Sequence, residues 1–131
     1  MNKLLALTVP IGLLLVACGP HQPIPQDCVA VDPPGMCSNA QAITINYNSH
    51  VVAPPNYCAD PNEDIEVRVV PRNGGVGTVT TEPKPGHPGW LAGTNDPDRN
   101  GFVLHATDEE GEHDYNVIFS DGCIIDPKIT I

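Results

Sequence analysis

Basic residues are scarce in this chain of 131 residues, which has 6 lysines and arginines against 16 aspartates and glutamates. The formal net charge of −10 repels the phosphate backbone of nucleic acids and anionic lipid headgroups. The composition therefore argues against a nucleic-acid partner. An acidic surface suits cationic partners or divalent ions, and it equally keeps a domain soluble.

Several patterns that accompany particular functions are also missing. The sequence has no run of about 20 apolar residues that could cross a bilayer as a helix, no sustained helical periodicity and no internal repeat. Ser38, Ser49 and Ser120 lie outside any G-x-S-x-G nucleophile elbow. No C-x-x-C pair is present, which argues against a thiol metal site. We therefore expect a protein that is not an enzyme.

An uncharged, largely apolar stretch, residues 4–17, follows Lys3 near the N-terminus. It is too short to cross a bilayer, and Pro10 and Gly12 within it disfavour a buried helix. A basic start, an apolar stretch and a small-residue exit are typical of a secretory signal. We predict a signal peptide over residues 1–17.

The residues that close this run, Leu15, Val16, Ala17 and Cys18, resemble the lipobox of bacterial lipoproteins. The resemblance implies cleavage before Cys18 and attachment of lipid to its thiol and its amine. Two or three acyl chains on one residue hold a protein durably on a membrane. Gly19 follows instead of aspartate, which by the sorting logic of enteric bacteria favours the outer membrane, periplasmic face or cell surface. The alternative is an ordinary cleaved signal with an incidental Cys18.

Three prolines in residues 18–27 predict a semi-rigid, extended tether of about 3.1 Å per residue. A Cys/Pro-rich lead-in follows at residues 28–41, and residues 42–131 form the predicted domain. With Cys18 assigned to lipid, an even set of cysteines remains for disulfides in an exported chain: Cys28, Cys37, Cys58 and Cys123. Of the three pairings, we favour Cys28 with Cys37 and Cys58 with Cys123.

From Ala42 onward, short β-rich runs alternate with clusters of Pro, Gly, Asn and Asp. The runs are residues 42–48, 65–70, 77–82, 102–107, 115–120 and 124–131. Their spacing predicts an all-β fold, an antiparallel β-sandwich of about six to seven strands.

A hairpin turning at Glu110-Gly111 would place the apolar residues of two runs on one face. The predicted facing pairs are Phe102 with Phe119, Leu104 with Val117, and Ala106 with Tyr115. In this register His105 and His113 point to opposite faces and cannot share a metal ion.

The ending YNVIFSDGCIIDPKITI loosely resembles the last two strands of small cupredoxin-like sandwich proteins, and the predicted strand pattern is also that of an Ig-like sandwich. Blue-copper proteins place a cysteine, a histidine and a methionine around this late loop. Here neither histidine nor methionine follows Cys123. The resemblance implies the fold without a blue-copper site.

The stretch TNDPDRNGF carries Asp96, Asp98 and Asn100 at alternate positions before Gly101, as at the start of a calcium loop. The twelfth position is Thr107 instead of an acidic residue, and a strand follows in place of a helix. These residues are also common in turns. Calcium binding by residues 96–101 and an ordinary turn both remain open.

His87 and the single tryptophan, Trp90, lie among prolines and glycines in PKPGHPGWLAG. Trp90 could anchor a partner or a glycan, or it could pack over the end of the sandwich. The sequence thus leaves two functions. One is a non-catalytic envelope lipoprotein whose sandwich binds an envelope protein or serves a structural role, without a cofactor. The other is a lipoprotein that binds a divalent ion, such as calcium, through residues 96–101.

Overall fold

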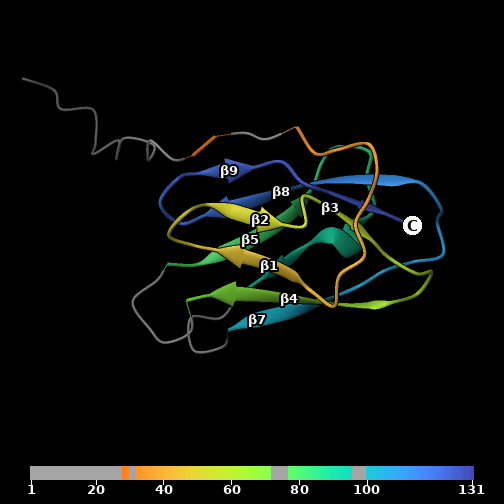
Figure 1. The fold of residues 1–131 in the computed structure, drawn as a ribbon, viewed down its shortest axis with the longest axis horizontal. Helices are drawn as coiled ribbons and strands as arrows, with labels where there is room; N and C mark the ends of the chain where they lie inside the picture. The colour runs from red at the N-terminus through yellow and green to blue at the C-terminus, as the bar shows by residue number, and fades with distance from the viewer. Residues whose placement is uncertain (1–27, 30–31, 72–76, 96–99) are drawn as a thin grey trace, which may run out of the picture.

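The computed structural model of the protein describes residues 28–29, 32–71, 77–95 and 100–131. Within these residues the chain forms two β-sheets that pack around one apolar core (Figure 1). The predicted all-β sandwich is therefore confirmed. The predicted signal peptide, Cys18 and the tether lie outside the described residues. No helix in the described part of the chain is long and apolar enough to cross a membrane.

The first sheet has four strands in the order β2-β1-β4-β7, which run from top to bottom in Figure 1. Their bounds are β1 Ile43–Asn46, β2 Val51–Ala53, β4 Asp64–Val70 and β7 Gly101–His105. β1 pairs antiparallel with β2 and parallel with β4, while β4 pairs antiparallel with β7. β2 and β7 are thus the two edges of this sheet.

The second sheet has six strands in the order β3-β10-β8-β5-β6, and β9 also pairs with β8. The bounds are β3 Asn56–Cys58, β5 Val79–Pro83, β6 Gly93–Thr94, β8 Glu112–Phe119, β9 Ile124–Ile125 and β10 Lys128–Thr130. A 3-10 turn, η1 (Gly89–Leu91), precedes β6. β3 pairs parallel with β10, and the other pairs are antiparallel.

The sheets are mixed, whereas the sequence predicted an antiparallel sandwich. After β2 the chain crosses to the second sheet as β3 and returns as β4 beside β1, so that β1 and β4 run in the same direction. The described residues contain ten strands instead of six or seven. β2, β3 and β6 were not predicted, and the predicted run 124–131 divides into β9 and β10. These five strands are two or three residues long, too short to show an alternating pattern.

The predicted hairpin around Glu110-Gly111 is wrong. β7 pairs with β4 in the first sheet, and β8 pairs with β5, β9 and β10 in the second. The chain between β7 and β8 therefore crosses from one sheet to the other. The facing pairs Phe102 with Phe119, Leu104 with Val117, and Ala106 with Tyr115 do not form. Both strands do turn their apolar faces to the core, from opposite sides.

The two histidines of these strands lie in different surroundings. His105 is exposed on β7, where its Nδ1 lies 2.5 Å from Asp64 Oδ1. His113 is buried on β8, and its Nε2 lies 2.8 Å from the Glu109 carbonyl oxygen.

Tyr115, in the core on β8, gives the fold a dependence on alkaline pH. Its side chain is 1% exposed, and burial raises the pKa of its hydroxyl above the ordinary value of about 10. Because the folded pKa is raised, the contribution of the neutral Tyr115 to the free energy of unfolding is fully present below about pH 10. It is lost as the pH rises towards the folded pKa. We expect the free energy of unfolding to fall by about 1.4 kcal/mol at pH 11.

Tyr115→Phe should remove this loss, as measured by urea denaturation at pH 7 and pH 11. Burial and the neighbouring Glu63 also raise the pKa of Tyr57, so a smaller alkaline loss persists in this variant. Tyr47→Phe is the control, because the Tyr47 hydroxyl bonds Ser120 Oγ in an exposed position. An alkaline loss that is equal in wild type and Tyr115→Phe would contradict the prediction.

Candidate functional site

Two disulfides fix the N-terminal lead-in to the sandwich. Cys28 bonds Cys123 with a Cα–Cα distance of 5.5 Å, and Cys37 bonds Cys58 with a Cα–Cα distance of 5.0 Å. The predicted use of these cysteines in two disulfides is confirmed. The favoured pairing of Cys28 with Cys37 and Cys58 with Cys123 is wrong.

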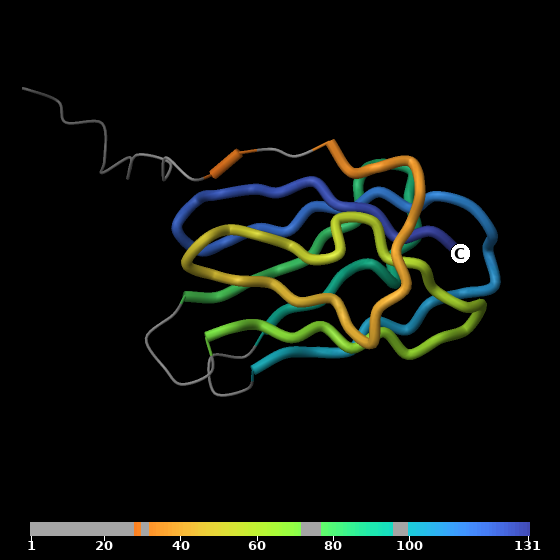
Figure 2. The backbone as a smooth tube through the Cα atoms, in the orientation of Figure 1, coloured from red at the N-terminus to blue at the C-terminus, as the bar shows by residue number. Residues whose placement is uncertain are grey.

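The path of the lead-in explains the observed pairing. Ser38 forms a parallel bridge to Tyr57, which brings Cys37 beside Cys58 at the end of β3. Further upstream, the lead-in runs along the side of the molecule where β9 lies, orange beside dark blue in Figure 2, and Cys28 reaches Cys123 there. Asn56 strengthens the attachment, because its Nδ2 donates to the Pro34 carbonyl oxygen at 2.8 Å.

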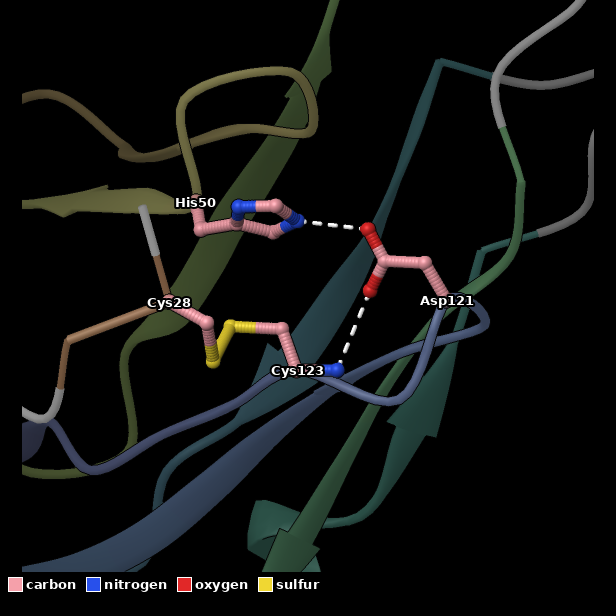
Figure 3. Close-up of a disulfide and its surroundings, with 4 residues drawn as sticks. All are labelled: Cys28, His50, Asp121 and Cys123. Carbon is pink, nitrogen blue, oxygen red and sulfur yellow. Dashed lines mark hydrogen bonds and ion pairs between the residues drawn. A yellow bond between two sulfur atoms is a disulfide. The ribbon is translucent and has the colours of Figure 1, made fainter. Parts of the chain in front are cut away.

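A partly buried contact between His50 and Asp121 links the two sheets beside the Cys28–Cys123 disulfide. His50 ends the β1–β2 turn, and its Nε2 lies 2.6 Å from Asp121 Oδ2 in the β8–β9 turn. The other carboxylate oxygen, Asp121 Oδ1, accepts a hydrogen bond from the Cys123 backbone N–H at 3.0 Å. Figure 3 shows His50 and Cys123 converging on this carboxylate. We call these four residues, Cys28, His50, Asp121 and Cys123, the clasp.

The clasp is well sheltered from water. The His50 and Asp121 side chains are 4% and 25% exposed, and the His50 ring meets Phe119 edge-on with centroids 4.9 Å apart. Neither His50 nor Asp121 was predicted from the sequence as a site residue. They are 71 positions apart, and neither lies in a motif, so no local signal indicates that they meet.

An apolar groove lies beside the clasp, between an edge of each sheet. Its volume is about 420 Å³, within the range of about 300–1,000 Å³ that is usual for small-molecule sites. One wall comes from β2 of the first sheet, and the other from β9 and the two residues after it. The apolar residues that line it include Val29, Val51, Val52, Ala53, Ile125 and Pro127.

The groove has a buried floor and an exposed apolar rim. Val52 and Ile125 are 6% and 4% exposed, whereas Val29 and Val51 are 61% and 52% exposed. Exposed apolar residues that line a concave surface are a common mark of a binding site. The clasp positions this rim, because Cys28 directly precedes Val29 and His50 directly precedes Val51.

His87 and Trp90 lie apart from the groove. The His87 Nδ1 accepts a hydrogen bond from the Asp114 backbone N–H at 3.2 Å. Trp90, in η1, is partly buried against the core, and its ring meets His113 edge-on with centroids 5.5 Å apart. This geometry corresponds to the packing role that the sequence left open for Trp90.

The candidate calcium residues are described only in part. Asp96 and Asp98 lie outside the described residues. Asn100 directly precedes β7, and its carbonyl oxygen accepts a hydrogen bond from the Val69 N–H at 2.9 Å. Among the residues that the structure describes, no group of three or more His, Cys, Asp or Glu side chains is placed to hold a metal ion. Calcium binding stays a prediction, tested by the melting temperature with and without millimolar calcium.

The geometry defines a disulfide-bonded all-β sandwich domain with an apolar groove at one side. The chain matches no family model, no curated protein and no solved structure. The resemblance to cupredoxin-like and Ig-like sandwiches therefore stays a prediction.

Removal of the clasp carboxylate should destabilise the domain. We expect Asp121→Ala to lower the free energy of unfolding by about 2 kcal/mol, because it removes the carboxylate that contacts the His50 Nε2 and accepts the Cys123 N–H. Urea denaturation at pH 7 measures the change. Asp64→Ala is the matched control: it removes the Asp64–His105 pair, whose side chains are 72% and 75% exposed, and should cost less than about 1 kcal/mol. Equal losses in both variants would contradict a structural role for the clasp.

Proposed function

We propose that this protein is a non-catalytic bacterial envelope lipoprotein, anchored through lipid on Cys18, whose sandwich is a binding or structural module. The observation that carries the proposal is the sequence of residues 15–18, LVAC. The disulfides support it, because structural disulfides persist in oxidising compartments such as the periplasm and cell surface. They also account for the four cysteines after Cys18, which leaves that residue for the anchor.

The placement of Cys28 supports a membrane-tethered domain. Cys28 follows Cys18 by ten positions and is bonded to Cys123 beside the apolar groove. A chain anchored at Cys18 would therefore enter the domain beside the groove. With Gly19 after the lipid, we favour the outer membrane, and an envelope component as partner.

The proposal is tested by the mass and location of the mature protein. The full chain is produced in a bacterium supplied with alkyne-labelled palmitate. We expect a mature chain that begins at Cys18, carries the label and sediments with membranes. Cys18→Ser should lose both the label and the sedimentation, whereas Gly19→Ala, the neighbouring control, should retain the label. A wild-type chain that still carries Met1, or whose Cys18 bears no lipid, overturns the proposal.

A further inference from the structure

We propose that the apolar groove binds one acyl chain of the lipid on Cys18. The inference rests on the proposed function, because it requires that lipid. It assigns to the groove an occupant that is covalently part of the same protein.

The groove is lined by aliphatic side chains on both sides. Its floor is made by Val52 and Ile125, and its rim by Val29 and Val51, so an apolar ligand meets aliphatic carbon on both walls. The volume of about 420 Å³ gives room for part of an unbranched acyl chain. Each methylene that leaves water contributes about 0.8 kcal/mol, so the groove favours an acyl chain that would otherwise contact water.

Two ionisable side chains, His50 and Asp126, line the groove, and both contact other protein side chains. His50 is held by Asp121 at 2.6 Å, and Asp126 forms an ion pair with Lys84. Both are therefore engaged by protein partners. A charged or strongly polar ligand would have to displace one of these partners, whereas an acyl chain leaves both pairs in place.

The lipid on Cys18 is a nearby source of the acyl chain. The disulfide fixes Cys28 at the margin of the groove, and Val29 lines it. The ten residue steps from Cys18 to Cys28 span at most roughly 36 Å when extended, so the lipid stays within that distance of Cys28 and can reach the groove. A tethered ligand has an effective concentration in the millimolar range. The lipid of the chain itself is thereby favoured over dilute free lipid.

Docking of one acyl chain does not release the protein from the membrane. A lipidated cysteine that carries two or three chains can leave the others in the bilayer. The docked chain would draw the groove towards the membrane surface. The anchor would then orient the sandwich as well as retain it.

The test is photo-crosslinking in membranes with the full chain. Cells supplied with a diazirine-labelled fatty acid produce the protein, the membranes are irradiated, and the crosslinked peptides are mapped by mass spectrometry. We expect crosslinks in the peptides that contain Val51, Val52 and Ile125. Val51→Asp places a charge on the rim and should lower the yield about tenfold. Val103→Asp is the matched control, because Val103 is 50% exposed on β7 at the opposite edge of the sheet, and it should leave the yield unchanged.

The possible results distinguish failure of this inference from failure of the proposed function. Lipid on Cys18 without crosslinks in the groove overturns this inference and leaves the proposed function intact. A mature Cys18 without lipid overturns the proposed function itself. Purified Cys18→Ser protein is also irradiated with vesicles of diazirine-labelled phosphatidylethanolamine, and groove crosslinks as strong as in wild type would identify a membrane lipid as the occupant and overturn the assignment to Cys18. Equal urea midpoints establish that each variant is folded.

Discussion

Replacing Cys28 and Cys123 together by alanine is expected to lower the free energy of unfolding by about 4 to 5 kcal/mol. The two cysteines are 95 positions apart, and a crosslink that closes a long loop removes much conformational entropy from the unfolded chain. The Cys37–Cys58 disulfide spans only 21 positions, so the corresponding double replacement should cost about 3 kcal/mol. Double variants are used so that no single thiol remains to form a new disulfide.

Urea denaturation of the two double variants at pH 7 measures both effects. The expectation that the variant without Cys28 and Cys123 is the less stable of the two depends on the pairing that the structure describes. If the variant without Cys37 and Cys58 were the less stable of the two, loop length would not be the main origin of the stabilisation. Loss of the Cys28–Cys123 bond would also release the chain near residue 28 from the sandwich. We therefore expect proteolysis near residue 28 to become faster in that variant alone.

Gly101→Ala is expected to destabilise the domain by about 3 kcal/mol or more. Gly101 opens β7, where it faces Arg68 of β4. A Cβ at this position would overlap the Val67 carbonyl oxygen, well inside van der Waals contact. Because the clash is with backbone, it can be relieved only by separating β4 from β7.

Gly89→Ala is the matched control for this substitution. A Cβ at Gly89 would have no neighbour within 4 Å, and we expect a change of no more than about 0.5 kcal/mol. Thermal or urea denaturation followed by circular dichroism compares the two variants. A Gly101→Ala protein as stable as Gly89→Ala would show that β7 can move away from β4 at little cost.

The longer strands were predictable from the sequence because each shows one buried face. Residues 65–70 alternate in sequence, and β4 alternates between buried and less buried side chains. The same holds for β8. Strands of two or three residues, such as β6 and β9, offer no such period. They exist because neighbouring strands supply hydrogen-bonding partners, which is information that a local pattern does not contain.

The wrong hairpin shows why an apolar face does not determine which strands pair. Leu104 and Val117 are both buried, as the alternation predicts. Two strands of one sheet and two strands facing each other across a sandwich both require an apolar face toward the core. The sequence of β7 and β8 therefore fits either arrangement. The pairing is decided by β4 and β5, which are distant in the chain.

The groove and the clasp were beyond prediction for a related reason. The walls of the groove come from β2 and β9, which are separated by most of the domain. Val51 and Ile125 appear in the sequence as ordinary strand residues. His50 and Asp121 become a pair only when their two turns meet at the same end of the sandwich.

The connection of Cys28 to Cys123 imposes an order on oxidative maturation. A chain made from its N-terminus presents Cys28 first, followed by Cys37 and Cys58, while the native partner of Cys28 appears last. Oxidation in order of appearance would join Cys28 to Cys37, and neither native bond could then form without thiol–disulfide exchange. The native pairing therefore forms directly only when Cys28 stays reduced until Cys123 has emerged, and otherwise it requires thiol–disulfide exchange.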